Sequence, residues 1–203
     1  MPNRRRWVIV RRRRIWRLLL VVLVIVGGAL AIRTAVRTLY PAAYATAVLG
    51  ASAQSGVDPR LVWAVMRTES HFRPTATSRS GALGLMQITP TTGEWIAAQR
   101  GQPNFTPARL MDPTYNAQTG VWYLAYLIAS FGGQLVPALA AYNAGMTPVR
   151  QWLTAGRWSG SLVDADRIPY LETRQFVQRV MRSYAIYRYL YAAPGGNEPS
   201  GGA

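Results

Sequence analysis

An unbroken apolar run near the N-terminus constrains the fold of this chain more than any other feature. Residues 18–32 read LLLVVLVIVGGALAI and contain no charged side chain. At a rise of about 1.5 Å per residue, such a helix covers roughly 22 Å of the ~30 Å hydrocarbon core of a bilayer. Neighbouring residues can extend it at both ends, and Arg17 and Arg33 can reach the headgroups. We therefore expect a single membrane-spanning helix over residues 15–36.

The basic segment before this run predicts its orientation. Residues 1–14 carry arginine but no acidic residue, and such leaders stay on the cytoplasmic side. We expect a cytoplasmic leader followed by a retained signal-anchor helix in the cytoplasmic membrane. A signal peptide cleaved after residues 29–31, whose sequence ALA has the small-x-small form, is the alternative. A twin-arginine signal at Arg13 and Arg14 is a weaker third possibility. All three place the rest of the chain on the extracytoplasmic side.

The net charge is concentrated in the same N-terminal segment. The chain has 23 basic and 8 acidic residues, and ten of the basic ones lie in the first 40 positions. The remaining 13 basic and 8 acidic residues leave a net charge of about +5, which suits an anionic polymer. Aromatic residues fall at helical core spacing, so we expect no nucleic-acid partner. With no cysteine and only one histidine, we expect no metal and no other cofactor.

The chain after residue 40 predicts one all-α domain over residues 41–192. Helix starts are indicated where a capping side chain is followed by proline. This pattern occurs at Asp58-Pro59, Thr89-Pro90, Asp112-Pro113 and Thr147-Pro148. The helices expected from it and from apolar periodicity cover residues 42–55, 60–68, 89–99, 112–131, 137–141 and 147–153, and a last one ends near Tyr191. A tail at residues 193–203, rich in Gly, Pro and Ser, is expected to be disordered.

Glu69 is the candidate acid of this domain. It follows the apolar helix expected over residues 60–68, and apolar neighbours disfavour the charged form of a carboxyl group. The resulting higher pKa is what a general acid needs near neutral pH. The alternative is an ordinary helix-end carboxylate paired with Arg67 or Arg73. His71 is a weak candidate for a base.

Four sequence blocks extend this observation. Residues 69–92 read ESHFRPTATSRSGALGLMQITPTT, and residues 110–113 read LMDP. Residues 138–145 read ALAAYNAG, and residues 168–177 read IPYLETRQFV. In this order the blocks resemble the lytic transglycosylase domain of the soluble-lytic-transglycosylase type, a relative of goose-type lysozyme that cleaves peptidoglycan glycan strands. The resemblance implies a lysozyme-like all-α fold, with peptidoglycan as the partner. The chain departs from the family pattern at Phe176, where tyrosine is common.

The resemblance implies a mechanism with a single carboxylate. Most glycosidases use two, but here the nearest acid after Glu69 is Glu94, on the following helix. In the family scheme, Glu69 protonates the glycosidic oxygen between N-acetylmuramic acid and N-acetylglucosamine while the substrate's N-acetyl group attacks. Glu69 then takes the proton of the 6-hydroxyl, and a 1,6-anhydro ring closes. A lysozyme-like hydrolase and a catalytically silent glycan-binding module are the alternatives.

The resemblance also implies which residues bind the glycan. These are Ser78, Met86, Gln87, Tyr142, Asn143, Tyr170 and Glu172. Ser78 would bond the substrate near the reacting sugar, and Tyr142 would hold Glu69 or the N-acetyl group. From the residues alone, Met86 could belong to the core, and Glu172 could be a structural acid paired with Arg174.

Overall fold

The structure is a computed structural model that describes residues 4–191, with side chains described from Trp16 onward. The chain divides into two compact units, Met1–Pro41 and Ala42–Ala203. The disordered tail predicted for residues 193–203 lies outside the described residues.

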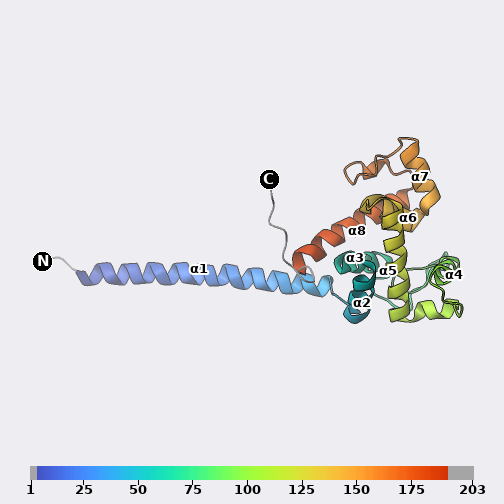
Figure 1. Cartoon of the computed structure of the whole chain (residues 1–203). Coiled ribbons are helices and arrows are strands. Elements are labelled where there is room, and N and C mark those ends of the chain that lie inside the picture. The colour runs from blue at the N-terminus through green and yellow to red at the C-terminus, as the bar shows by residue number, and fades with distance from the viewer. Residues whose placement is uncertain (1–3, 192–203) are drawn as a thin grey trace. The chain divides into compact units, whose positions relative to one another are not determined.

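The first unit consists of one helix, α1 (Arg4–Leu39), drawn in blue in Figure 1. Its stretch Trp16–Leu39 is long and apolar enough, by length and composition, to cross a membrane. The large apolar side chains of this stretch are exposed, as a lipid-facing surface requires. The segment predicted to span the membrane, residues 15–36, therefore lies within a single continuous helix.

The second unit is helical. Its elements are α2 (Ala45–Ser55), α3 (Pro59–Glu69), α4 (Pro90–Gln99), η1 (Pro107–Met111), α5 (Pro113–Ser130), α6 (Leu135–Ala144), α7 (Met146–Thr154), η2 (Ala165–Arg167) and α8 (Leu171–Leu190). No strand forms in the described part of this unit, and its β-type contacts are isolated bridges from Leu83 to Thr77 and Ile88. The all-α fold predicted from the sequence is therefore confirmed.

The predicted capping residues begin three of these helices. The side chains of Asp58, Thr89 and Asp112 each accept a hydrogen bond from a first-turn backbone amide, at 2.7 to 3.2 Å. A proline follows each of them, as expected. Gly56, with φ of 72°, ends α2 in the left-handed conformation. The start of α2 falls three residues later than predicted, after Tyr44, whose φ is 54°.

Other helix ends differ from the prediction. The helix expected over residues 137–141 is the longer α6. Thr147 does not cap α7, which begins one residue earlier, at Met146. Gly145, with φ of 87°, makes the bend between α6 and α7, so no separate capping loop is needed. Two of the connections between the expected helices contain the short 3-10 helices η1 and η2.

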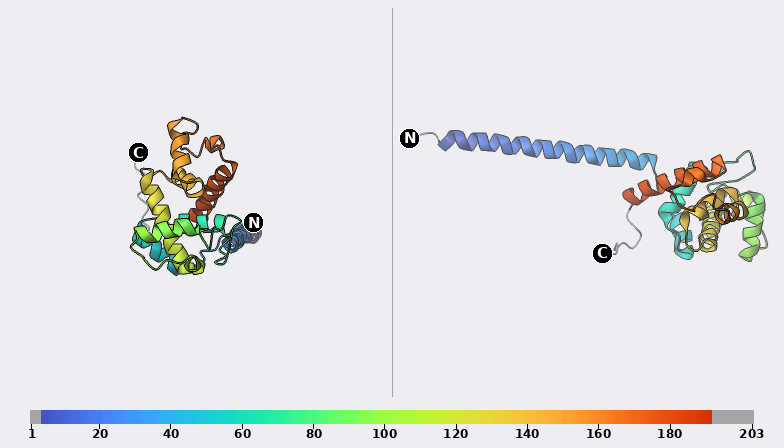
Figure 2. Two further views of the ribbon diagram at one scale, coloured as in Figure 1. Left: turned by 90° about the vertical axis from the view of Figure 1, so that its right-hand side faces the viewer. Right: turned by 90° about the horizontal axis from the view of Figure 1, so that it is seen from above.

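Helix α5 forms the centre of the second unit and packs against α2, α6, α4 and η1 (Figure 1). Its residues Val121, Leu124 and Leu127 are fully buried. Helix α3 packs along α8, and α6 packs against both α7 and α8. Figures 1 and 2 show that α7 lies at the opposite end of this unit from α2. Because α3 packs along α8, the helix that carries Glu69 is held by the long C-terminal helix.

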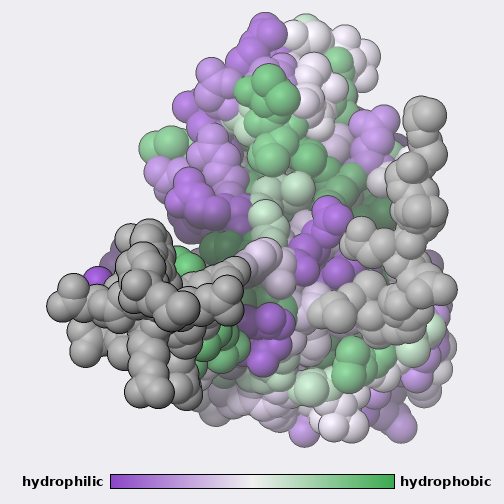
Figure 3. Space-filling model, turned by 90° about the vertical axis from the view of Figure 1, so that its left-hand side faces the viewer, coloured by the Kyte–Doolittle hydropathy of each residue, from purple (hydrophilic) through white to green (hydrophobic). Residues whose placement is uncertain are grey.

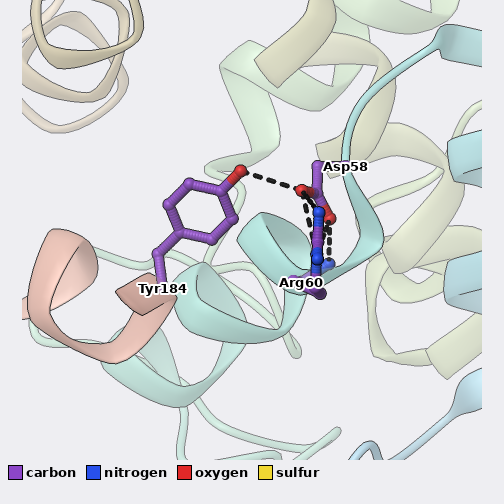
Figure 4. A network of polar contacts seen from close by, with 3 residues as sticks. All are labelled: Asp58, Arg60 and Tyr184. Carbon is purple, nitrogen blue, oxygen red and sulfur yellow. Dashed lines mark hydrogen bonds and ion pairs between the residues drawn. The ribbon is translucent and has the colours of Figure 1, made fainter. Parts of the chain in front are cut away.

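A polar network joins the start of α3 to α8 (Figure 4). The Tyr184 hydroxyl donates a 2.8 Å hydrogen bond to Asp58, and the Arg60 guanidinium binds the same carboxylate at 2.7 to 3.0 Å. Burial alone would raise the pKa of Asp58, but these hydrogen bonds lower it below its ordinary value. Burial and the bond to Asp58 raise the pKa of Tyr184 to about 12. The network thus bonds the N-terminal end of α3 to α8.

Exposed apolar surface is concentrated in the first unit. Within the second unit, the exposed large hydrophobic side chains are Leu49, Trp95, Leu162, Val163, Tyr170, Leu171 and Tyr189. On the face drawn in Figure 3, hydrophobic residues lie between hydrophilic ones. Apolar and polar side chains are therefore mixed on the described surface of the second unit.

Candidate active site

Glu69 is the last residue of α3, and its carboxyl group is largely buried. Burial, and after it the negative charge of Glu172, raise the pKa of Glu69 from 4.5 to about 8. The positive charge of Arg179 acts in the opposite direction. Glu172 and Arg179 both belong to α8, which packs along α3. This environment confirms the expected rise in pKa and keeps the carboxyl group protonated at neutral pH.

A tight loop over residues 76–88 covers the end of α3. The amide of Gly84 donates to the carbonyl of Ala76 at 2.9 Å, and the Ser70 hydroxyl donates to the carbonyl of Leu85 at 2.8 Å. Gly84 has φ of 78°, and a Cβ there would lie 2.2 Å from the carbonyl oxygen of Leu110. Only glycine fits this position, so the loop takes one defined path beside Glu69.

Met86 is the residue through which this loop is tied to the neighbouring helices. Its amide donates to the side-chain oxygen of Asn116 on α5 at 2.7 Å. Its carbonyl accepts a 2.8 Å hydrogen bond from the Tyr142 hydroxyl on α6. Its side chain has no exposed surface and packs on Gly120, where an added Cβ would lie 2.4 Å from the Met86 sulfur. The Met86 side chain therefore belongs to the packed interior.

Tyr142 lies close enough to Glu69 for their charges to interact. Burial raises the pKa of Tyr142 well above its ordinary value, and the charges of Glu69 and Tyr123 raise it further. Its ring stacks on Phe176, with centroids 6.2 Å apart and planes 7° apart, and it tilts against Tyr123 at 5.5 Å. Tyr142 thus remains a neutral hydrogen-bond donor beside the carboxyl group, and in the structure it donates to Met86.

Three further predicted residues have polar partners of their own within the domain. The Ser78 hydroxyl accepts from the amide of Ala82 at 2.9 Å and pairs with the Ser80 hydroxyl. The Gln87 amide nitrogen donates to two loop carbonyls, at 2.9 and 3.1 Å, from a backbone with φ of 49°. The side-chain oxygen of Asn143 accepts from a threonine hydroxyl of α8 at 2.7 Å. Each side chain is thus oriented by the fold.

The last two predicted residues lie near the start of α8. Tyr170 is 53% exposed, and its ring meets Trp152 edge-on at a centroid distance of 4.9 Å. Glu172 is exposed, and its charge acts on Glu69. Arg174 does not pair with it, because the Arg174 guanidinium donates to the carbonyl of Ile168 at 2.9 and 3.2 Å.

The structure adds three residues that were not predicted for the site. Arg179 opposes the charge of Glu172, and Tyr123 packs on Tyr142. Asn116 accepts from the amide of Met86 and donates to the carbonyls of Leu83 and Leu110, each at 2.9 Å. A sequence signal exists for Arg179, because residues seven apart share one face of a helix and Glu172 was already a candidate.

The candidate site and the helical fold around it agree with the similarity of this chain to known proteins. The family model described as "Transglycosylase SLT domain" matches residues 46–161. The chain is 40% identical over 129 residues to soluble lytic murein transglycosylase of Escherichia coli, covering 62% of this chain and 20% of that protein. It is 34% identical over 167 residues to membrane-bound lytic murein transglycosylase C of Edwardsiella ictaluri, covering 71% and 46% respectively. It therefore spans a fifth to under half of the length of these relatives.

Solved structures of the same group are also similar. The 70 kDa soluble lytic transglycosylase of Escherichia coli has a TM-score of 0.73 at 33% identity, covering 77% of this chain and 26% of that one. An inactive Glu-to-Gln mutant of lytic transglycosylase Slt from Pseudomonas aeruginosa has a TM-score of 0.68 at 34% identity, covering 74% and 24%. Since the family model matches more than half of its residues and the fold agrees, the chain belongs to the transglycosylase SLT domain family.

Proposed function

We propose that the chain is a peptidoglycan lytic transglycosylase anchored in the cytoplasmic membrane. It would cleave the β-1,4 bond between N-acetylmuramic acid and N-acetylglucosamine and leave a 1,6-anhydro-muramic end. The observation that carries the proposal is the buried carboxyl group of Glu69, whose pKa is raised to about 8. The names of its relatives, and the inactive Glu-to-Gln mutant of one of them, support the same assignment.

In this proposal Glu69 acts first as an acid and then as a base. With a pKa of about 8, roughly nine in ten Glu69 side chains carry the proton at pH 7. Glu69 gives this proton to the glycosidic oxygen as the bond to C1 breaks, while the substrate's N-acetyl group attacks C1. The Glu69 carboxylate then removes the proton of the C6 hydroxyl, whose oxygen bonds to C1 as the bond between C1 and the N-acetyl oxygen breaks. The proton returns to Glu69, and no water is consumed.

The other proposed substrate-binding groups are side-chain atoms that are not used in hydrogen bonds within the domain. Gln87 uses its amide nitrogen on loop carbonyls, so its oxygen would accept from the glycan. Asn143 uses its oxygen, so its NH₂ group would donate. Ser78, Tyr170 and Glu172 would contact sugars through partly or fully exposed side chains.

Met86 and Tyr142 have different places in the proposal. The buried side chain of Met86 would support the groove from beneath. Its backbone is bonded to Tyr142, which would hold the N-acetyl group or Glu69 during the reaction.

Membrane attachment is assigned to residues 15–36, with residues 1–14 as a cytoplasmic leader. The long apolar helix α1 and the relative named as membrane-bound support this assignment. Residues 41–192 would then act on glycan strands outside the cytoplasmic membrane. The intact mass of the membrane-extracted protein decides between a retained anchor and a cleaved signal peptide, because cleavage removes the first 31 residues.

Digestion of purified sacculi by the full chain in detergent tests the activity. Mass spectrometry separates anhydro-ended products from reducing-ended ones, which are heavier by one water. We expect anhydro products from the parent chain and from the control Glu94→Gln, a change on the exposed face of α4. We expect none from Glu69→Gln. Products with only reducing ends would show a hydrolase, and no release by the parent would indicate a silent binding module.

A further inference from the structure

The first turn of α8 carries a residue to which the proposed function assigns no role. Glu172, in this turn, acts through its charge on Glu69. The next residue, Thr173, has a hydroxyl that donates a 2.7 Å hydrogen bond to the side-chain oxygen of Asn143, near the end of α6. Thr173 is 1% exposed, so it cannot touch a glycan strand itself. Any effect of Thr173 on the reaction must therefore act through Asn143.

The single proton of the Thr173 hydroxyl determines which way the Asn143 amide points. A hydroxyl has one proton to donate, and this hydroxyl forms no other hydrogen bond within the described residues. If the amide were turned by 180°, its NH₂ group would meet the hydroxyl, and the hydroxyl proton would be buried without an acceptor. An unpaired buried donor is costly, so the structure favours one of the two amide orientations.

The favoured orientation leaves the Asn143 NH₂ group available to a ligand. This group forms no hydrogen bond in the part of the chain that the structure describes, and Asn143 is only half-buried. An NH₂ group donates and cannot accept. The glycan atom that it meets must therefore be an acceptor, such as the carbonyl oxygen of an N-acetyl group or a ring oxygen. The reverse orientation would present an acceptor to the strand instead.

We propose that Thr173 is a positioning residue that holds the Asn143 amide with its NH₂ group toward the bound glycan. This rests on the proposed function, because Asn143 contacts a strand only if the chain binds glycan. Thr173 takes no part in bond cleavage. Its hydroxyl keeps the amide in the donor orientation before the strand arrives, so the contact forms without a rearrangement of the amide.

Two substitutions at Thr173 separate the effect of its hydroxyl from that of its shape. Thr173→Val has nearly the same shape but no hydroxyl, whereas Thr173→Ser keeps the hydroxyl. Initial rates of sacculus digestion by the full chain in detergent, at limiting substrate, measure kcat/KM for each. We expect about a fivefold loss in Thr173→Val, which corresponds to one hydrogen bond of about 1 kcal/mol. Thr173→Ser should keep the parent rate, and an equal loss in both variants would overturn the proposal.

A buried threonine of α5 supplies the matched control. Thr119 is also 1% exposed, but its hydroxyl has no hydrogen-bond partner in the structure. Thr119→Val therefore makes the same change to a buried side chain without the loss of a bond, and it should keep the parent rate. Circular dichroism at the assay temperature gives the folded fraction of each variant, so that rates are compared per folded molecule. Equal losses in Thr119→Val and Thr173→Val would contradict the positioning role.

A double-mutant cycle tests whether Thr173 acts through Asn143. Asn143→Ala removes the amide that the hydroxyl orients. In that background Thr173→Val should cause no further loss of rate. A second fivefold loss would show that Thr173 acts by another route and would overturn the proposal. A parent-like rate of Thr173→Val with Asn143 intact would do the same.

Glycan binding separates this inference from the proposed function. The probe is chitotetraose, an oligosaccharide of N-acetylglucosamine, titrated by calorimetry into the parent and both Thr173 variants. If the parent binds the probe but cleaves no glycan, the proposed function fails, and about fivefold weaker binding by Thr173→Val alone still supports the positioning role. Equal binding by the parent and Thr173→Val would then overturn it. A parent that neither cleaves glycan nor binds the probe would overturn both.

Discussion

The Tyr142 hydroxyl donates a 2.8 Å hydrogen bond to the backbone carbonyl of Met86, a residue 56 positions earlier in the chain. This bond joins α6 to the loop that covers Glu69. Because the loop is also bonded to α5 through Asn116, its position relative to the carboxyl group depends on both helices. The proposed acid is therefore held by contacts between segments far apart in the sequence.

Tyr142→Phe should weaken this attachment without changing the packing of the ring. The loss of one buried hydrogen bond costs about 1 kcal/mol, which corresponds to about 2–4 °C in melting temperature for a chain of this size. We expect this decrease together with slower glycan cleavage. Thermal unfolding by circular dichroism in detergent measures it. Tyr189→Phe, at a position 81% exposed, is the matched control and should leave the melting temperature unchanged. Equal shifts in both variants would contradict the assignment.

Removal of the charge of Glu172 and removal of the charge of Arg179, both on α8, should shift the pH–rate profile in opposite directions. The negative charge of Glu172 raises the pKa of Glu69, and the positive charge of Arg179 lowers it. Glu172→Gln should therefore move the alkaline limb of the pH–rate profile to lower pH, and Arg179→Gln should move it to higher pH. Initial rates of glycan release, recorded over the pH values of the alkaline limb, measure both shifts. Added salt should reduce both, because Glu172 and Arg179 are exposed.

An exposed arginine of the same helix supplies the control for this pair. Arg182→Gln also removes one positive charge from α8, but Arg182 is not among the groups that act on Glu69. Its profile should coincide with that of the parent. Shifts of the same sign in Glu172→Gln and Arg179→Gln would show that the charges do not act through Glu69.

Stability should depend on pH through the same carboxyl group. The pKa of Glu69 is raised from 4.5 to about 8 on folding, so the native state favours the protonated form. Its stabilising contribution is complete below about pH 4.5 and is lost as the pH rises through about 8. Glu69→Gln resembles the protonated form at every pH. We expect it to match the parent in melting temperature at low pH and to exceed it at about pH 9.

The exposed acid Glu94 again supplies the control for Glu69→Gln. Glu94→Gln should change the melting temperature little at either pH. A difference between Glu69→Gln and the parent that stays constant across the pH range would rule out the raised pKa.

Two glycines of the loop allow the effect of space to be separated from the effect of backbone conformation. Gly81 and Gly84 both have positive φ, at 80° and 78°. An added Cβ at Gly81 meets nothing within 4 Å, whereas at Gly84 it would lie 2.2 Å from a backbone oxygen. Gly81→Ala should cost about 1–2 kcal/mol, the usual cost of the left-handed conformation. Gly84→Ala should cost clearly more, and equal melting temperatures would contradict the close packing of this loop.

Helix positions could be predicted because their signals are local. Asp58, Thr89 and Asp112 cap helices through bonds to residues two or three positions away. Thr147 has the same local signal and does not act as a cap, because Gly145 already supplies the bend. The pattern around Thr147 does not indicate that Gly145 makes this bend, because the bend depends on how α6 and α7 pack.

The partners of the candidate site residues could not be predicted in the same way. The raised pKa of Glu69 follows from the apolar helix that carries it, so its direction was available from the sequence. The burial of Met86 against Gly120 and the charge of Arg179 depend on how α5 and α8 pack on the loop. These contacts connect residues more than 30 positions apart, where periodicity and capping patterns give no information.

The anchoring of Met86 has a consequence for attempts to alter this protein by directed evolution. A segment whose backbone is bonded to α5 and α6 tolerates few replacements, because each one disturbs several helices at once. Libraries that randomise residues 84–87 should therefore yield mostly inactive clones. The loop around Val163, a side chain that is 94% exposed, offers far more freedom to recombine and diversify.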